Sequence, residues 1–409
     1  MKKPGPKRNE NSLKNRAKLK AFYVETPLWE QICTVAETTG REKSAVLNEA
    51  IQIYLNIGAF KETIDTKHYD VVSLFSGCGG MDLGLLGGFS AFGREYPLHQ
   101  NKSEKSFRIL FANDINRDAL QVYRDYFRKR DPESRILQGD IKSYLDELEK
   151  NSALEIAAFP AAADVVVGGF PCQDFSVAGK RKGFSAERGM LYQQMIRVVE
   201  KLNPKIFVAE NVKGLTNLGD ALETIKQDFS KTGKTGYRIF SKLHHAADFG
   251  VPQTRERVFI VGIRKDLNPD AFSFPFETHS SHPDEDGLLP WLTAKKAIGD
   301  LEENSHLVPN QSQYSKAKNY GEHCQGNRKI KADYPGPTIR AEHHGNIEFH
   351  YSLPRRLTVR ECARIQSFPD DFTFQCSGSA AYKMIGNAVP PVLGWHIAES
   401  IMKALGTWE

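Results

Sequence analysis

The sequence lacks the features of a membrane, secreted or zinc-binding protein. No window approaches ~18 consecutive apolar residues, so no transmembrane helix is expected. The N-terminus is charged and has no apolar stretch of a signal peptide, which predicts a cytoplasmic protein. The six cysteines include no CxxC pair, and this argues against both a zinc site and a disulfide framework. They are Cys33, Cys78, Cys172, Cys324, Cys362 and Cys376.

The composition is that of an ordinary core-forming protein. Of the 409 residues, 40% are hydrophobic and 26% are charged. These values exclude a wholly disordered chain and a fibrous one. At roughly 150 residues per domain, the length suggests two or three domains. No internal repeat is visible.

Positive charge is concentrated at the N-terminus. The net charge is only +5, but the first 20 residues carry eight lysines and arginines against the single acid Glu10. We interpret residues 1–17 as a basic disordered tail, which attracts phosphate in a salt-dependent way. A tail that only improves solubility is the alternative.

Strands alternate with helices from Asp70 onward. Helical spacing, as in 190–202, separates the apolar runs, and this alternation predicts a doubly wound α/β sheet over 70–264. Such runs are typical of strands covered on both faces. They lie at 71–75, 107–114, 164–169, 205–211 and 257–264.

The pattern breaks between 265 and 355. This stretch is rich in Pro, His, Asn and Ser and has few strong helices. It predicts a separate, smaller and irregular domain. Helical spacing returns in 356–409, which we expect to rejoin the sheet domain.

The first strand runs into a glycine-rich turn, SLFSGCGGMDLG (73–84). Its Gly77, Gly79 and Gly80 let a ligand approach the backbone at a helix N-terminus. Asp114 and Asp140 follow at later strand ends, where carboxylates accept hydrogen bonds from ribose hydroxyls. No phosphate-binding lysine accompanies the glycines, which favours S-adenosylmethionine over a nucleoside triphosphate. Alternatively, both acids only cap strand ends.

A cysteine stands on a sharp turn at the carboxyl edge of the predicted sheet. In GGFPCQDFS (168–176), Cys172 follows a strand, two glycines and a proline. A lone cysteine is usually a small core residue, but the polar neighbours Gln173, Asp174 and Ser176 argue against burial here. The basic loop that follows, GKRKGFSAERG (179–189), could close over a polyanion.

An acid and two arginines are expected at the same edge. Glu210 ends the strand that contains AENV, and Arg255 and Arg257 begin QTRERVFIVG (253–262). Because the two arginines alternate, they lie on one face of the strand, where they can grip a polar ring. A plain ion pair between Glu210 and an arginine is the alternative.

These motifs stand in the order found in the C5-cytosine DNA methyltransferases, which the chain resembles over about residues 70–400. RLTVRECARIQSFPDDF (356–372) and AYKMIGNAVPPVLG (381–394) complete the set. The PCQ, ENV and GNAVPP segments are highly specific. The resemblance implies an α/β methyltransferase fold, S-adenosylmethionine as methyl donor and double-stranded DNA as substrate.

The resemblance also implies catalytic roles. Cys172 adds to carbon 6 of cytosine and so activates carbon 5, while Glu210 relieves charge at N3. Arg255 and Arg257 orient the catalytic groups and hold the cytosine carbonyl. The target base must first be flipped out of the duplex.

Cofactor residues are implied in the same way. Phe75 resembles the ring that stacks on adenine, Gly77–Gly80 the turn at the methionine part, and Asp140 an adenine partner. Asn387 matches the asparagine of the last motif. Asp114 departs from the family, which more often has Glu there.

The irregular stretch corresponds to the family's target-recognition domain. YPGPTIRAEHHGNIEFH (334–350) is its most distinctive part and resembles domains that read short GG-centred palindromes. Adjacent histidines on a strand point to opposite faces, so no metal site is expected. Base-edge or phosphate contacts are the better interpretation. The residues predicted to contact DNA are Gln173, Ser176, Arg340, His343, His344 and Asn346.

Residues 18–60 resemble a ribbon-helix-helix module, with GREKSAVLNEAIQIYL (40–55) as its second helix. Such modules dimerise through the strand and read DNA in the major groove. The resemblance implies a homodimer and a transcriptional autoregulator. A docking arm is the alternative.

The sequence thus predicts a site-specific DNA (cytosine-5)-methyltransferase that protects host DNA from a partner restriction endonuclease. Two alternatives remain open at this point. One is a tRNA cytosine-5 methyltransferase of the same fold, and the other is a DNA-binding regulator with an inactive methyltransferase half. No function is predicted for an insertion at residues 88–107.

Overall fold

The structure is a computed structural model, and two compact units divide the chain, Met1–Thr63 and Ile64–Glu409. The predicted basic tail and nearly all of the predicted ribbon-helix-helix module fall outside the described residues, so both stay predictions. The residues described are 33, 34, 36, 37, 42–44, 67–150, 159–171, 191–302, 308–317, 327–341 and 347–408.

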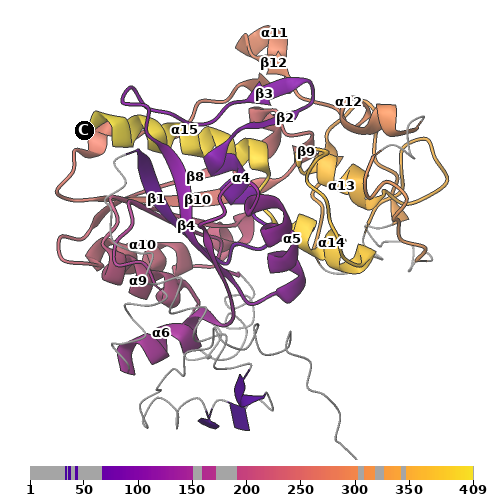
Figure 1. Cartoon of the computed structure of the whole chain (residues 1–409). Coiled ribbons are helices and arrows are strands. Elements are labelled where there is room, and N and C mark those ends of the chain that lie inside the picture. The colour runs from indigo at the N-terminus through magenta and orange to yellow at the C-terminus, as the bar shows by residue number, and fades with distance from the viewer. Residues whose placement is uncertain are drawn as a thin grey trace, which may run out of the picture. The chain divides into compact units, whose positions relative to one another are not determined.

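Seven strands form one sheet at the centre of the larger unit (Figure 1): β1 (His68–Leu74), β4 (Ser106–Asp114), β5 (Arg135–Gln138), β6 (Val165–Gly168), β7 (Ile206–Val212), β8 (Tyr237–His245) and β10 (Glu256–Arg264). Their order is β5-β4-β1-β6-β7-β10-β8. Neighbours from β5 to β7 are parallel, and β10 is antiparallel to both β7 and β8. The predicted α/β fold and its five expected strands are confirmed.

Two features of the sheet were not predicted. Strand β8 is an edge strand whose burial is irregular, so its sequence, YRIFSKLHH, lacks a continuous apolar run. The chain then returns through η2 (Ala246–Phe249) and the short β9 (Gln253–Thr254) into β10 without a crossover helix. A connection of this kind makes an antiparallel pair.

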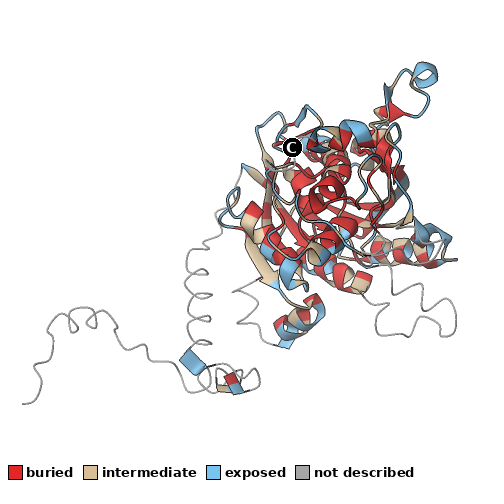
Figure 2. Ribbon diagram, turned by 90° about the vertical axis from the view of Figure 1, so that its right-hand side faces the viewer, coloured by how far each residue is buried: buried red, intermediate tan, exposed pale blue. Residues whose placement is uncertain are grey.

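Alternate residues of each strand face two separate hydrophobic cores. In β1, Val71 belongs to one core and Val72 to the other. This burial on both faces explains the continuous apolar runs. Figure 1 shows a helix layer on each side of the sheet, and Figure 2 shows buried residues gathered between them. The first core includes α4 (Gly80–Leu86), α5 (Arg117–Phe127) and α15 (Pro391–Thr407), and the second includes α6 (Ile141–Lys150), α9 (Leu191–Leu202) and α10 (Ala221–Lys231).

The C-terminal motifs form helices that belong to the same compact unit as the sheet. Helix α13 (Val359–Ile365) begins with a capping box, in which Thr358 and Glu361 each bind the other's backbone N–H. Such a box satisfies donors that a helix start otherwise leaves unpaired. Helix α14 (Gly378–Asn387) follows and leads into α15, which packs against α4.

The insertion at 88–107 contains a hairpin, β2 (Phe89–Ala91) and β3 (Arg94–Tyr96). The rings of Phe89 and Tyr96 stack at 5.0 Å, and Tyr96 meets Trp395 of α15 edge-on at 5.6 Å. Trp395 Nε1 also donates to the Pro97 carbonyl (2.9 Å). These contacts fix the hairpin to the C-terminal helix.

The described parts of 265–355 contain only short elements: η3 (Pro269–Ala271), β11 (His279–Ser280), α11 (Pro283–Asp286), β12 (Leu289–Pro290), α12 (Ala294–Ile298), η4 (Gly299–Glu302) and β13 (Gly336–Pro337). Ile298, Ile339 and Ile347 are buried in the same core as α13 and α15. The predicted boundaries of a recognition domain therefore remain a prediction. Among the described residues, no helix has the length and apolar character needed to cross a bilayer.

Candidate active site

Four neighbouring parallel strands bring their carboxyl-terminal parts into one row at the edge of the sheet. Leu74 pairs with Asn113 on one side and with Gly168 on the other, and Gly168 pairs with Ala209. The parallel register brings the predicted cofactor turn and the predicted catalytic acid to one edge, where sheets of this kind bind ligands. The residues that follow these positions are Phe75, Asp114, Gly169 and Glu210.

The glycine turn after β1 is closed around Asp114. The backbone N–H of Gly77 donates to Asp114 Oδ2 (2.8 Å), and that of Asn116 donates to Oδ1 (2.7 Å). Gly77 has a φ of +56° and open space where a Cβ would be. At Gly79 and Gly80 a Cβ would lie 2.3 Å from its nearest neighbour. The turn is therefore open to a ligand at Gly77, whereas it is tightly packed against the protein at Gly79 and Gly80.

Apolar side chains stand next to this acid. Phe75 adopts a φ of +53°, which is uncommon for a residue with a side chain, and it packs at the rim of the second core. Ile115, directly after Asp114, is 71% exposed. Burial raises the pKa of Asp114 above its ordinary value. Ile115 was not predicted as a site residue, although an apolar residue directly after a strand-end acid is a usable signal.

Asp140 and Asn387, two predicted cofactor residues, lie at the ends of different helices. Asp140 precedes α6, and its carboxylate accepts from the backbone N–H of Lys142 (3.1 Å) and from Ser143 Oγ (3.1 Å). Both are bonds that a carboxylate makes at a helix N-terminus. Asn387 is the last residue of α14 and is exposed.

Glu210 and Arg257 form the polar centre of the edge. Arg257 Nε lies 2.8 Å from Glu210 Oε1, and the two side chains are only 10% and 12% exposed. Burial raises the pKa of Glu210, and the nearby positive charges of Arg257 and Arg255 partly offset that rise. A raised pKa favours the protonated carboxyl, which can donate a hydrogen bond.

Arg255, two residues before Arg257, binds backbone carbonyls. Its Nη1 donates to the Ile339 carbonyl (3.1 Å), and its Nη2 donates to those of Gly386 (2.7 Å) and Ala388 (3.0 Å). The side chain is fully buried, and this burial lowers its pKa. Arg255 thus ties two distant segments to the start of β10.

The strand end at Glu210 also holds the loop that leads to Cys172. Asn211 is buried, and its Nδ2 donates to the Phe170 carbonyl (3.0 Å). A Cβ on Gly169 would lie 2.9 Å from Glu210 Oε2, so glycine leaves room for the carboxylate. Neither Asn211 nor Gly169 was predicted to have a role, although both stand inside the ENV and GGFPCQ motifs that marked the site.

Six predicted residues lie outside the described part of the chain. They are the nucleophile candidate Cys172 and the DNA candidates Gln173, Ser176, His343, His344 and Asn346. Phe170 and Pro171, which immediately precede Cys172, are described. Arg340 is described and exposed.

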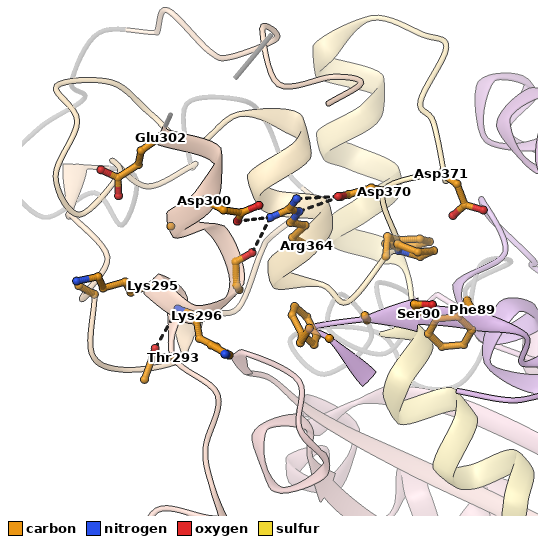
Figure 3. A pocket seen from close by; sticks show the side chains of 18 of the residues that line it. Phe89, Ser90, Thr293, Lys295, Lys296, Asp300, Glu302, Arg364, Asp370 and Asp371 are labelled. Carbon is orange, nitrogen blue, oxygen red and sulfur yellow. Dashed lines mark hydrogen bonds and ion pairs between the residues drawn. The ribbon is translucent and has the colours of Figure 1, made fainter. Parts of the chain in front are cut away.

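A pocket of about 1500 Å³ is formed by other residues (Figure 3). Its walls come from the β2–β3 hairpin, from α12 and η4, and from the segment that follows α13. Arg364 donates to Asp300 (2.6 Å) and, through two nitrogens, to Asp370 (2.8 and 2.7 Å). None of the predicted site residues lines this pocket, and its charges are of both signs.

The sheet order, the glycine turn after the first strand and the carboxylates at one edge define an α/β methyltransferase. A solved structure of a proposed DNA modification methyltransferase from an Escherichia coli prophage has this fold. It matches with a TM-score of 0.55 at 22% identity, over 83% of this chain and 99% of that chain.

The family follows from sequence comparison. The model for the C-5 cytosine-specific DNA methylases matches residues 69–403, and the chain belongs to this family. It is 36% identical to the type II methyltransferase M.NgoFVII of Neisseria gonorrhoeae, over 81% of this chain and 86% of the relative. It is 34% identical to M.BspRI of Lysinibacillus sphaericus, over 92% of this chain and 89% of the relative. The enzyme is therefore a DNA (cytosine-5)-methyltransferase, and DNA is better supported than tRNA as its substrate.

Proposed function

We propose that the enzyme methylates carbon 5 of a flipped-out cytosine through a covalent adduct with Cys172. The observation that carries this proposal is the pairing of Glu210 with Arg257 (2.8 Å), beside the loop that Asn211 fixes at Phe170. This loop continues directly into Cys172. Cytosine chemistry requires a carboxyl group, an arginine and a thiol, and the sequence supplies the thiol one residue after the described Pro171.

The edge residues fit S-adenosylmethionine as the methyl donor. Gly77 borders open space, Asp114 offers carboxylate oxygens to the ribose hydroxyls, and Phe75 and Ile115 offer apolar surface to the adenine. We assign the methionine part to Gly77–Gly80 and further contacts to Asp140 and Asn387. Bound there, S-adenosylmethionine supplies an electrophilic methyl group.

The thiolate of Cys172 starts the reaction. Its sulfur forms a bond to carbon 6, and the electron pair of the 5,6 double bond makes carbon 5 nucleophilic. After carbon 5 is methylated, a base removes its proton, the double bond re-forms and the bond from sulfur to carbon 6 breaks. Cysteine suits both steps because it attacks well and leaves again.

Glu210 manages the charge that the addition pushes into the ring. In its protonated form the carboxyl donates to N3 and neutralises the developing negative charge. The burial that raises the pKa of Glu210 supports this protonation state. Arg257 holds the carboxyl group, and we assign it the cytosine carbonyl as well, whereas we assign Arg255 an orienting role through the carbonyls that it binds.

Target choice belongs to other residues. The reacting atom cannot be reached inside a stacked duplex, so the cytosine is flipped out. We assign DNA contacts to Gln173 and Ser176 near the nucleophile and to Arg340, His343, His344 and Asn346 in the recognition stretch. Residues 265–355 as a whole are proposed to select the sequence.

The proposed biological role is protection of host DNA from a partner restriction endonuclease. Bisulfite sequencing of DNA from cells that express the gene tests it, because 5-methylcytosine resists conversion. We expect one short sequence to be methylated throughout the genome and to resist an endonuclease that cuts there. Cells that express Cys172→Ser should lack both effects. Methylation confined to tRNA in the same cells would contradict the proposal.

The N-terminal arm is proposed as a homodimeric operator-binding module in a cytoplasmic enzyme. Deleting residues 1–60 should leave methylation intact, because every catalytic motif begins at or after Asp70. The same deletion should derepress a reporter driven by the gene's own promoter. Equal repression by the truncated and intact enzymes would instead favour a docking arm.

A further inference from the structure

Gln253 is a fully buried amide at the start of the QTRERVF motif, and its side chain is paired on every side. Its Oε1 accepts from the Ile339 N–H (3.0 Å), and its Nε2 donates to the Ile365 carbonyl (3.2 Å) and to Gln366 Oε1. A buried amide with two donors and an acceptor in use fits only one arrangement of the segments around it.

Two further side chains close these bonds into a ring. Gln366 is also fully buried, and its Nε2 donates to the Ala388 carbonyl. Arg255 donates to the same carbonyl (3.0 Å) and to the carbonyl of Ile339 (3.1 Å). Gln253, Gln366, Ala388, Arg255 and Ile339 therefore form a closed circuit, here called the polar ring. Both backbone polar groups of Ile339 are held by it.

The polar ring joins the proposed recognition stretch to the catalytic pair. On one side, Ile339 continues into Arg340, whose backbone is so close to Gly386 that a Cβ there would lie 2.5 Å from the Arg340 carbonyl carbon. On the other side, Arg255 stands two residues before Arg257, which holds Glu210. A shift of residues 339–340 would therefore displace an acceptor of Arg255.

Backbone pairing strengthens this connection. Strand β13 pairs with β9, with Gly336 opposite Gln253, and Thr338 Oγ1 donates to the Thr254 carbonyl (2.7 Å). The segment that leads to the predicted DNA contacts is thus built onto the strand that leads to Arg257. The proposed recognition stretch and the strand that leads to Arg257 are therefore joined by backbone pairing and by a side-chain hydrogen bond.

We infer that Gln253 is a positioning residue that couples correct seating of the recognition stretch on DNA to the geometry of Arg257 and Glu210. This inference rests on the catalytic roles proposed above for those two residues. It concerns sequence discrimination in the chemical step, because Gln253 is buried and acts through Ile339 and Arg255. When the DNA does not hold residues 339–340 in their correct position, Arg257 and Glu210 are displaced from the geometry that the reaction needs.

The test compares three glutamine variants of the full-length enzyme. Gln253→Met and Gln366→Met keep side-chain volume but open the polar ring at different points. Gln194→Met is the matched control, since Gln194 is buried in α9 and accepts a hydrogen bond from Arg197 Nη1 (2.8 Å), outside both the ring and the proposed recognition stretch. Single-turnover methyl transfer is measured on the target duplex found by bisulfite sequencing and on a duplex with one base pair changed. S-adenosylmethionine affinity and the thermal midpoint are measured alongside.

Opening the ring should slow transfer on the target duplex by about 10- to 100-fold, the cost of a small misplacement of catalytic groups. The ratio of rates between the target and changed duplexes should fall, with cofactor affinity within about twofold of wild type. Because one break opens the ring, the double variant Gln253→Met/Gln366→Met should be no slower than the slower single variant. Gln194→Met should lose thermal stability and keep both rate and ratio.

Either opened-ring variant with the rate and ratio of Gln194→Met would overturn the inference. If Gln253→Met fails to fold, Gln366→Met carries the same expectations. The catalytic proposal is tested apart from this, by Glu210→Gln in the same assay. A fully active Glu210→Gln enzyme overturns the catalytic roles, whereas a fully active Gln253→Met enzyme overturns only the coupling.

Discussion

Arg257 binds Glu210 diagonally across two antiparallel strands, with Nε 2.8 Å from Oε1. Directly opposite Glu210 in the register stands Phe259, and Arg257 is two residues nearer the edge of the sheet. Side chains two apart share a face of a strand, so the arginine reaches back from the rim to the carboxylate. The pair lies near the end of the buried sheet, and its two side chains are only 10% and 12% exposed.

Glu210→Gln should slow methyl transfer by ~10²-fold or more, as expected for a lost general acid. The amide keeps the shape of the side chain but cannot deliver a proton to N3. S-adenosylmethionine affinity should stay nearly unchanged. Glu256→Gln is the matched control, because Glu256 pairs with Lys213 on the surface beside the same edge. Wild-type turnover in Glu210→Gln would reduce Glu210 to a member of an ion pair.

Gly169→Ala should lower turnover by about tenfold or more, in the range that small misplacements of catalytic groups cause. The added Cβ would stand 2.9 Å from Glu210 Oε2 and push the carboxylate away from its position on Arg257. Gly214→Ala serves as the control, since its Cβ would meet only Val212 Cγ2 at 3.6 Å. Steady-state kinetics of the two variants should therefore differ, and equal turnover would show that the carboxylate moves without cost.

Asp82 makes stability depend on pH. It is fully buried, with Ser73 Oγ donating to its Oδ2 (3.0 Å), and burial raises its pKa to about 6. The folded protein therefore binds this proton more tightly than the unfolded chain does. The contribution of Asp82 protonation to the free energy of unfolding is complete below about pH 4. It is lost as the pH rises through about 6. The total is on the order of 3 kcal/mol, taking 1.36 kcal/mol per pKa unit.

Asp82→Asn should remove this dependence. Thermal midpoints measured from pH 4 to 8 should fall less steeply for the variant than for wild type between pH 4 and 7, and run parallel above that. Asp118→Asn, at an exposed position in the first turn of α5, should leave the wild-type slope unchanged. An unchanged slope in Asp82→Asn would mean that Asp82 stays charged in the folded enzyme throughout this range.

Exchanging residues 265–355 for the same region of M.NgoFVII should change the sequence that is methylated. Within this region, 265–302 is tied to the catalytic unit, because Trp291 Nε1 donates to Asp248 (2.8 Å) and Lys242 pairs with Glu277 (2.8 Å). Exchanging 265–302 alone should therefore not transfer the full specificity of M.NgoFVII, because the rest of the selecting region stays unchanged. Bisulfite sequencing identifies the sequence that each chimera methylates. An active 265–355 chimera that still methylates the original target would contradict the assignment of these residues to target selection.

Many residues at the carboxyl edge of the sheet could be predicted from the sequence, because apolar runs and short motifs mark them locally. Continuous apolar runs located five of the seven strands, and the motif ENV placed Glu210 at a strand end. The alternation of Arg255 and Arg257 predicted a common strand face, but Arg255 precedes β10 and binds backbone carbonyls, whereas Arg257 binds Glu210. Strand β8 was missed because an edge strand with irregular burial has no apolar run to detect.

The supports of the site could not be predicted, because they join residues far apart in the chain. Arg255 binds the carbonyls of Ile339 and Gly386, and Gln253 binds Gln366. Backbone carbonyls leave no trace in side-chain patterns, so the partners of a buried arginine or amide emerge only when the chain is folded. The same holds for Asn211, whose acceptor is the Phe170 carbonyl.

The most direct test of the account is covalent trapping on a duplex with 5-fluorocytosine at the mapped target. Fluorine on carbon 5 cannot be removed as a proton, so the bond from sulfur to carbon 6 persists after methylation. Wild-type enzyme with S-adenosylmethionine should form a denaturation-resistant adduct, and peptide mapping should locate it at Cys172. Cys172→Ser should form none while still binding the duplex, because its phosphate and base contacts remain. An active wild-type enzyme that forms no adduct, or forms one at another residue, would contradict the account.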